Sequence, residues 1–235
     1  MRILLTRPEH DARRTAATLR EMGHEVIVAP LLRIEAASDA DLGAEPCAAI
    51  IITSANAARA IASNERYYEL RHIPVYAVGE RSAETMRIAG FSDVTSADGN
   101  VEDLARLVAE RMEPGSRLLY LAGAERSADL GRALAGFTVH TAVIYRAVIV
   151  ENLPLAAVDA LAGGIDGVLH FSRRTADAYV SAVGAAGVAE LALQGPIHFC
   201  LSAGVAEPLL RAGATKVRIA ARPDEAALIA LVAAT

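Results

Sequence analysis

The chain has 235 residues, of which 53% are apolar and 22% charged, and its net charge is −5 at pH 7. This composition is typical of a globular protein, and its acidic balance excludes a nucleic-acid-binding profile. No stretch reaches the roughly 18 uncharged apolar residues of a membrane span, and Arg7 comes too early for a signal peptide. With only Cys47 and Cys200 as thiols, we expect a cytoplasmic protein with no membrane or nucleic-acid partner.

Several catalytic chemistries lack the residues they need. The sequence contains no P-loop, dinucleotide-binding glycine motif, zinc-protease motif, paired-cysteine motif or nucleophile elbow. Lys216 is the single lysine, so Schiff-base chemistry has one candidate. The histidines are scattered, and His170 and His198 lie inside apolar runs, as ordinary strand residues do. We therefore expect no metal site.

Short apolar runs alternate along the chain with alanine-rich helical stretches, which indicates βα units and a parallel sheet. A strand is expected at 2–6, a helix at 9–22 that ends at Gly23, and a second strand at 25–30. Further strands are expected at 49–53, 75–78, 93–96, 117–122, 138–150, 167–171, 197–201 and 216–220. A helix at 224–234 closes the chain.

An internal repeat organises this pattern. Residues 75–108 resemble residues 198–231 at a constant offset of 123, with shared Ala-Glu and Ala-Gly pairs at fixed spacing. Just upstream, residues 49–60 resemble residues 167–178 at an offset of 118. Two repeats predict two similar α/β domains.

The number of strands in each part of the chain indicates how the two domains divide it. The second repeat has few strands, and the N-terminal βαβ segment has no others to pair with. We therefore expect a discontinuous domain of residues 1–34 plus 149–235, with residues 36–145 inserted as the other domain. The linking segments 31–37 and 143–150 are apolar and extended. The expected fold class is α/β, with two similar parallel-sheet domains joined by a two-stranded connector.

Ligands of parallel sheets bind outside the carboxyl ends of the strands, so the turns after the strands form the candidate site. These turns carry hydroxyls and arginines at helix starts, and each hydroxyl taken alone also fits an ordinary helix N-cap. As a set, helix N-termini that face one inter-domain cleft favour a ligand with many carboxylates or phosphates. The candidate binding residues are Arg7, Thr53, Ser54, Asn56, Gly79, Arg81, Gly123, Arg126, Ser172, Arg173 and Ser202.

The same turns, in the same order, resemble those of a known family. The sequence is similar to uroporphyrinogen-III synthases over nearly its whole length, in the segments LLTRP, IITSANA, VYAVGERSAETMRIAGF, LYLAGAERSADL, VIYRAV, VLHFSRRTADAYV and HFCLSAGVAEPLLRAG. The order and spacing of these segments carry the resemblance. Its most telling piece is VIYRAV after the GAERS turn.

The resemblance implies two α/β domains with the active site between them, and a lyase that uses no cofactor or metal. The implied reaction cyclises hydroxymethylbilane, a linear tetrapyrrole with eight carboxylates. Water is lost and the last pyrrole ring is inverted, giving uroporphyrinogen III in haem biosynthesis. The family holds its ligand largely through backbone amides. Its tyrosine near the connector corresponds to Tyr145, the expected catalytic residue, and its hydroxyl-bearing turns correspond to Thr53, Ser54 and Ser172. We expect a monomer.

Two other classes stay open on the residues alone. One is a sensor module that binds a polyanion and releases it unchanged. The other is a nucleotide-sugar transferase with two facing α/β domains, although the sequence has no acidic metal motif or strong nucleotide loop. Incubation with fresh hydroxymethylbilane, followed by isomer analysis of the oxidised product, distinguishes the three.

Overall fold

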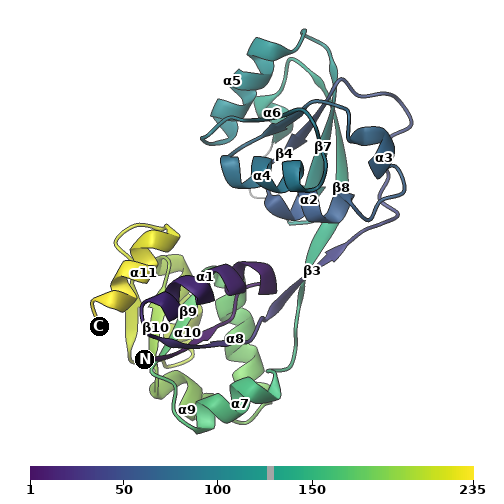
Figure 1. Cartoon of the computed structure of the whole chain (residues 1–235). Helices are drawn as coiled ribbons and strands as arrows, with labels where there is room; N and C mark the ends of the chain where they lie inside the picture. Colours follow the sequence, from purple (N-terminus) through teal and green to yellow (C-terminus); the bar gives the residue numbers. More distant parts are fainter. Residues whose placement is uncertain (126–129) are drawn as a thin grey trace. The chain divides into compact units, whose positions relative to one another are not determined.

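The computed structural model describes residues 1–125 and 130–235, which divide into two compact units (Figure 1). Unit 1 comprises Met1–Arg33 and Val148–Thr235, and unit 2 comprises Ile34–Ala147. Each unit is a sheet covered by helices on both faces. The predicted fold class, two parallel-sheet α/β domains, is confirmed.

The sheet of unit 1 is parallel and has the strand order β11-β10-β9-β1-β2. Leu4 of β1 lies opposite Ile27 of β2 and Val168 of β9, which makes β1 a central strand. A central parallel strand is buried on both faces, and this is why it reads as a continuous apolar run. The strand bounds are Arg2–Leu5 (β1), Glu25–Val28 (β2), Gly167–His170 (β9), Ile197–Cys200 (β10) and Val217–Ile219 (β11).

Alternate strand residues of unit 1 face two separate cores, because successive side chains of a strand point to opposite faces. Ile3, Leu5 and Phe199 pack against α1 (Glu9–Glu21) and α11 (Glu225–Ala233). Leu4, Val168 and Cys200 pack against four helices on the other face. These helices are α7 (Leu155–Ala162), α8 (Arg173–Ala185), α9 (Ala189–Gln194) and α10 (Ala203–Arg211).

The sheet of unit 2 has the order β3-β8-β7-β4-β5-β6, and β4 to β8 pair in parallel. β3 and β8 overlap the two expected linking segments, 31–37 and 143–150, and lie side by side. The Ala37 amide donates to the Ile144 carbonyl at 2.8 Å. The strand bounds are Leu32–Ala36 (β3), Ala49–Ile52 (β4), Val75–Ala77 (β5), Val94–Ser96 (β6), Arg117–Gly123 (β7) and Thr138–Ile149 (β8).

Helices cover both faces of this second sheet as well. Ile50, Ile52 and Leu121 pack with α2 (Ala55–Ile61), α3 (Tyr67–Leu70) and α4 (Glu80–Ile88). Ile51, Leu118 and Tyr120 pack with α5 (Val101–Arg111) and α6 (Leu130–Ala133). Both layers are visible in the unit that carries these labels in Figure 1.

The internal repeat is visible in the structure of the two units. Helix α4 and strand β6 coincide with α10 and β11 at the offset of 123, and β4 coincides with β9 at the offset of 118. The strand order β6-β5-β4 in unit 2 is repeated as β11-β10-β9 in unit 1. Equivalent turns therefore follow equivalent strands in the two sheets.

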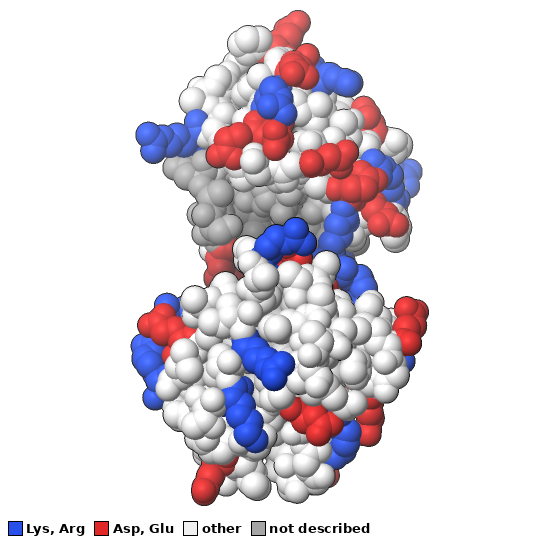
Figure 2. Space-filling view, turned by 90° about the vertical axis from the view of Figure 1, so that its left-hand side faces the viewer, with Lys and Arg blue, Asp and Glu red and all other residues white. Residues whose placement is uncertain are grey.

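The charged side chains do not gather into one large patch of a single sign on the face that Figure 2 shows. Figure 2 shows acidic and basic side chains interspersed on each unit, with wide uncharged areas between them. Over the described part of the chain, the helices are too short or too polar to cross a membrane.

Candidate functional site

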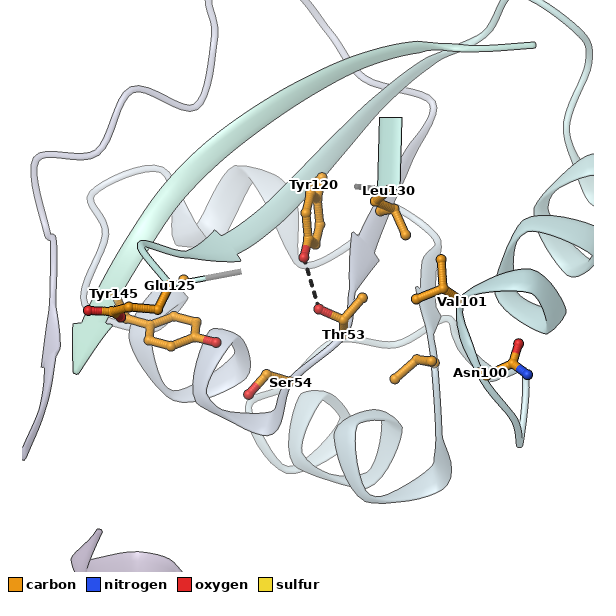
Figure 3. Close-up of a pocket in the computed structure, with 10 residues that line it drawn as sticks. Thr53, Ser54, Asn100, Val101, Tyr120, Glu125, Leu130 and Tyr145 are labelled. Atoms are coloured by element: carbon orange, nitrogen blue, oxygen red, sulfur yellow. Dashed lines mark hydrogen bonds between the residues drawn. The ribbon is translucent and has the colours of Figure 1, made fainter. Parts of the chain in front are cut away.

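A pocket of about 290 Å³ opens in unit 2 at the carboxyl ends of the parallel strands (Figure 3). Three strands end there together, because parallel strands present their carboxyl ends at one edge of the sheet. The turns after these strands are the ones that the sequence marked as candidates. The lining residues are Thr53, Ser54, Val78, Asn100, Val101, Tyr120, Gly123, Glu125, Leu130 and Tyr145.

Two hydroxyls follow β4 on the floor of this pocket. Ser54 is the N-cap of α2 in an extended conformation, and its Oγ accepts from the Asn56 amide at 3.2 Å. The Oγ1 of Thr53 lies 2.9 Å from the hydroxyl of Tyr120, and either can be the donor (Figure 3). Since a hydroxyl has one donor and two acceptor positions, this pair can still bond a polar group of a ligand.

Tyr145 enters the pocket from β8, and its half-buried ring points toward Ser54 (Figure 3). Burial raises the pKa of Tyr145 above its ordinary value of 10, a hydrogen bond with the Ser54 side chain opposes this, and Tyr120 and Glu125 reinforce it. The phenol is therefore protonated at neutral pH and can donate a proton. Tyr145 also borders a second cavity of about 400 Å³, lined in part by Asp39 and Arg146.

The remaining candidates of unit 2 stand apart from the pocket lining or outside the described structure. The Asn56 side-chain oxygen accepts from Arg59 at 2.6 Å. Gly79 is the N-cap of α4, and Arg81 is exposed in the first turn of that helix. Arg126 lies outside the described residues. The predicted residues that the structure brings together around one pocket are Thr53, Ser54, Gly123 and Tyr145.

In unit 1, the predicted serines begin helices at the carboxyl ends of β9 and β10. Ser172 is the N-cap of α8, and its Oγ accepts from the Thr175 amide at 3.1 Å. Ser202 is the N-cap of α10, and within the described chain no side-chain cap bond is formed there. The guanidinium of Arg173 donates to Glu207 at 2.8 Å.

Arg7 has protein partners within unit 1. Its Nη1 donates to Thr15 Oγ1 at 2.9 Å and to Glu225 Oε1 at 3.0 Å, which ties α1 to α11. The guanidinium carbon lies 4.0 Å from the centroid of the Phe171 ring. Burial lowers the pKa of Arg7, and the nearby carboxylates of Glu225 and Asp11 oppose this. A ligand would have to compete with these partners for the guanidinium.

Tyr120 and Glu125 line the pocket but are absent from the sequence-derived candidates. Tyr120 is 5% exposed and lies inside β7, whereas the predicted site consists of residues that follow the strands. The sequence signal that could have identified Tyr120 is a tyrosine three positions before the end of an apolar strand, because its hydroxyl can reach the edge of the sheet where ligands bind. Whether such a side chain faces a helix or a pocket depends on packing.

Among the described residues, no group of three or more His, Cys, Asp or Glu side chains is placed to hold a metal ion. The buried histidines of unit 1 pair with each other instead. Nε2 of His170 lies 3.1 Å from Nδ1 of His198, between β9 and β10. They are core residues, as their apolar sequence context predicted.

Comparisons with known proteins identify the family. The family model "Uroporphyrinogen-III synthase HemD" matches residues 13–230. The crystal structure of uroporphyrinogen-III synthetase from Helicobacter pylori 26695 has 20% identity and a TM-score of 0.64, and the match covers 100% of this chain and 99% of that chain. A mutant uroporphyrinogen III synthase from the extremely thermophilic bacterium Thermus thermophilus has 16% identity and a TM-score of 0.47, covering 100% of this chain and 98% of the other. The comparison with curated proteins gave no match. The similarity to the Helicobacter pylori structure concerns the fold, whereas the family match spans most of the sequence, and on that match the chain belongs to the uroporphyrinogen-III synthase family.

Proposed function

We propose that this chain cyclises hydroxymethylbilane to uroporphyrinogen III, with the pocket of unit 2 as part of its active site and Tyr145 as the proton donor. Membership of the family supports the reaction. The observation that carries the site is the place of the Tyr145 phenol, which lines this pocket at the carboxyl ends of parallel strands, together with Ser54. Burial raises its pKa above the ordinary value of 10, so the phenol is protonated at neutral pH. In this family the reaction is that of a cyclising hydro-lyase in haem biosynthesis.

The reaction needs little help from catalytic side chains, because the substrate itself expels the leaving group. A pyrrole nitrogen pushes electrons toward the carbon that carries the hydroxyl, the C–O bond breaks, and the departing hydroxyl takes a proton and leaves as water. The resulting azafulvene is electrophilic, and the last ring attacks it through the ring carbon that already carries the methylene bridge to the third ring. That bridge bond then breaks and re-forms at the free α-carbon of the last ring, which loses the proton that restores the pyrrole. A phenol beside the departing hydroxyl supplies that proton, and positioning of the curled chain is worth about 7–11 kcal/mol in favourable cases.

The substrate class that we propose is an octacarboxylate. Hydroxyls, arginines and helix N-termini all bind carboxylates, and the chain places them after equivalent strands of two similar sheets. In unit 2 the proposed contacts are Thr53, Ser54, Asn56, Gly79, Arg81 and Arg126. In unit 1 they are Arg7, Ser172, Arg173 and Ser202. We also propose that the enzyme acts as a monomer in the cytoplasm. We further propose that it has no nucleic-acid partner, and its net charge of −5 supports this last point.

Product analysis tests the reaction. The protein is incubated with freshly made hydroxymethylbilane, and the product is oxidised and separated into its isomers. We expect isomer III at a rate far above that of spontaneous closure, which gives the unflipped isomer. Recovery of the unflipped isomer at the spontaneous rate would contradict the proposal and favour a polyanion-binding sensor. Turnover only with a nucleotide sugar would favour a transferase.

Salt is expected to weaken the binding of a uroporphyrin-like octacarboxylate, but only in part. Exposed charges are screened over about 8 Å near physiological ionic strength, whereas hydrogen bonds from backbone amides inside a pocket are screened less. Titration calorimetry at low and high salt measures the effect. The same affinity at every salt concentration would contradict a binding site for a polyanion.

Ser54→Ala and Ser172→Ala are each expected to cost about 1 kcal/mol, because each replacement removes a helix cap and a hydroxyl from a proposed binding turn. Unfolding in urea measures the stability, and the Kd for the octacarboxylate measures the binding. Ser181→Ala, in an exposed position of α8, is the matched control and should change the stability by less than about 0.5 kcal/mol. A Ser54→Ala protein with unchanged stability and affinity would remove Ser54 from the site.

A further inference from the structure

We infer that Gly123 is a positioning residue for Tyr145: the missing side chain at the end of β7 leaves the space in which the Tyr145 ring lies. The inference rests on the proposed role of Tyr145. It gives Gly123 a different role from the direct contact with substrate that the sequence indicated. Two features of the sheet carry it, namely the space around Gly123 and the register of β7 against β8.

The first feature is the close approach of the phenol to the Gly123 backbone. A Cβ atom added at Gly123 would lie 2.6 Å from Cζ, 2.7 Å from Cε2 and 2.8 Å from the hydroxyl oxygen of Tyr145. Real Cβ atoms essentially never come within 3.0 Å of another heavy atom. Gly123 does not belong to the positive-φ glycines of the described chain, so backbone conformation does not require glycine there. A glycine inside a strand often marks such a close approach.

The second feature is a β-bulge that aims Tyr145. From Arg117 opposite Thr138 to Ala122 opposite Val143, β7 and β8 keep one register, but Gly123 then lies opposite Tyr145. Ile144 is the extra residue. In a regular strand, the neighbouring side chains of Ile144 and Tyr145 would point to opposite faces of the sheet. Here both pack against the same core, the one that α2 covers. The bulge thus directs the ring toward Ser54 (Figure 3). Gly123 leaves the space for it.

The added methyl group would meet the far end of a side chain, which can swing, and not a fixed backbone. Gly123→Ala is therefore expected to leave the fold intact and to displace the Tyr145 phenol from Ser54. We expect turnover to fall about 10-fold to 100-fold, as for loss of the Tyr145 hydroxyl itself. Gly136→Ala is the matched control, because a Cβ there meets no described atom within 4 Å, and it should keep full turnover.

A double-variant cycle separates positioning from substrate contact. If Gly123 acts through the Tyr145 hydroxyl, Gly123→Ala should cost little further turnover in a Tyr145→Phe background. If the two losses multiply in the double variant, Gly123 contacts the substrate independently and the proposal is wrong.

A spectroscopic measurement tests the geometry without activity. With ring-¹³C-labelled tyrosine, the signal of Tyr145 is identified by its loss in Tyr145→Phe. We expect Gly123→Ala to shift this signal and to leave the other five tyrosines in place. An unshifted Tyr145 signal would overturn the proposal whatever the turnover. If Tyr145→Phe were fully active, the catalytic role of Tyr145 would fail, but a shifted signal would still establish the positioning.

A further variant covers the case in which Gly123→Ala fails to fold. Tyr145→Ala removes the ring, so the Cβ at position 123 then has space. The double variant Gly123→Ala, Tyr145→Ala should fold as well as Tyr145→Ala alone, as measured by circular dichroism. If the methyl group at position 123 unfolds the protein in this background too, the ring is not what requires glycine, and the proposal is wrong.

Discussion

Tyr145→Phe is expected to lower turnover about 10-fold to 100-fold, with folding and ligand affinity nearly unchanged. The ring is kept, so its packing against the core of unit 2 is kept, and only the hydroxyl beside Ser54 is lost. General acid catalysis is typically worth about 100-fold to 10,000-fold. We expect the low end because the leaving hydroxyl departs with strong electronic push and can take its proton from water.

Single-turnover kinetics with hydroxymethylbilane measure this loss, and a urea melt measures the stability of the same sample. Tyr68→Phe is the matched control, because Tyr68 on α3 is 71% exposed and lines neither cavity described above. Full activity of Tyr145→Phe would remove the phenol from the mechanism. Loss of activity that follows only from unfolding would make Tyr145 a structural residue of β8.

Acid is expected to destabilise unit 1 by roughly 3 kcal/mol through His198 alone. His198 is fully buried, and its Nε2–H donates to the Leu193 carbonyl at 3.3 Å, while its Nδ1 accepts from Nε2–H of His170. This arrangement of hydrogen bonds requires His198 to be neutral, because its Nδ1 must keep a lone pair to accept. Nδ1 of His170 is buried without a hydrogen-bond partner in the described structure, so a proton there would be left unsatisfied. Burial lowers the pKa of His198 from 6.5 to about 4, and burial together with His198 lowers the pKa of His170 well below 6.5.

The pH window follows from these directions. Below pH 6.5 the unfolded chain binds protons on these histidines, whereas the folded chain does not until its lower pKa values are reached. The contribution of the neutral histidines to the free energy of unfolding is therefore fully present above pH 6.5 and is lost as the pH falls toward 4. Urea unfolding between pH 7.5 and 4.5 measures the slope.

His198→Gln should flatten that slope, because an amide keeps a donor and an acceptor but does not titrate in this range. His72→Gln, at an exposed position of unit 2, is the control and should leave the slope unchanged. Equal pH dependence in the wild type and His198→Gln would show that His198 does not control acid stability.

The sequence by itself determined the order of elements and the fold class. Central parallel strands are buried on both faces, so β1, β4, β9 and β10 appear as apolar runs that need no tertiary information. The repeat was visible for the same reason, since equivalent strands and turns face equivalent demands. The family, too, was recognisable from the order of its turns, and the match over residues 13–230 confirms it.

Strand pairing and the fate of single turn residues belong to the tertiary structure. β1 and β2 lie in one sheet with β9, β10 and β11, more than a hundred residues away along the chain. Arg7 follows its strand as expected, yet Glu225 at the far end of the chain accepts its hydrogen bond. Local sequence does not encode which distant carboxylate reaches an arginine.

The direction of Tyr145 is the clearest case. A β-strand sets the faces of its side chains by strict alternation, so from sequence alone Tyr145 and Ile144 would point to opposite faces. One extra residue opposite the end of β7 reverses this, and Gly123 leaves the space for the ring. A bulge is a property of two paired strands and not of either one. The sequence therefore identified the tyrosine, and only the pairing of β7 with β8 brought it to Ser54, Thr53 and Tyr120.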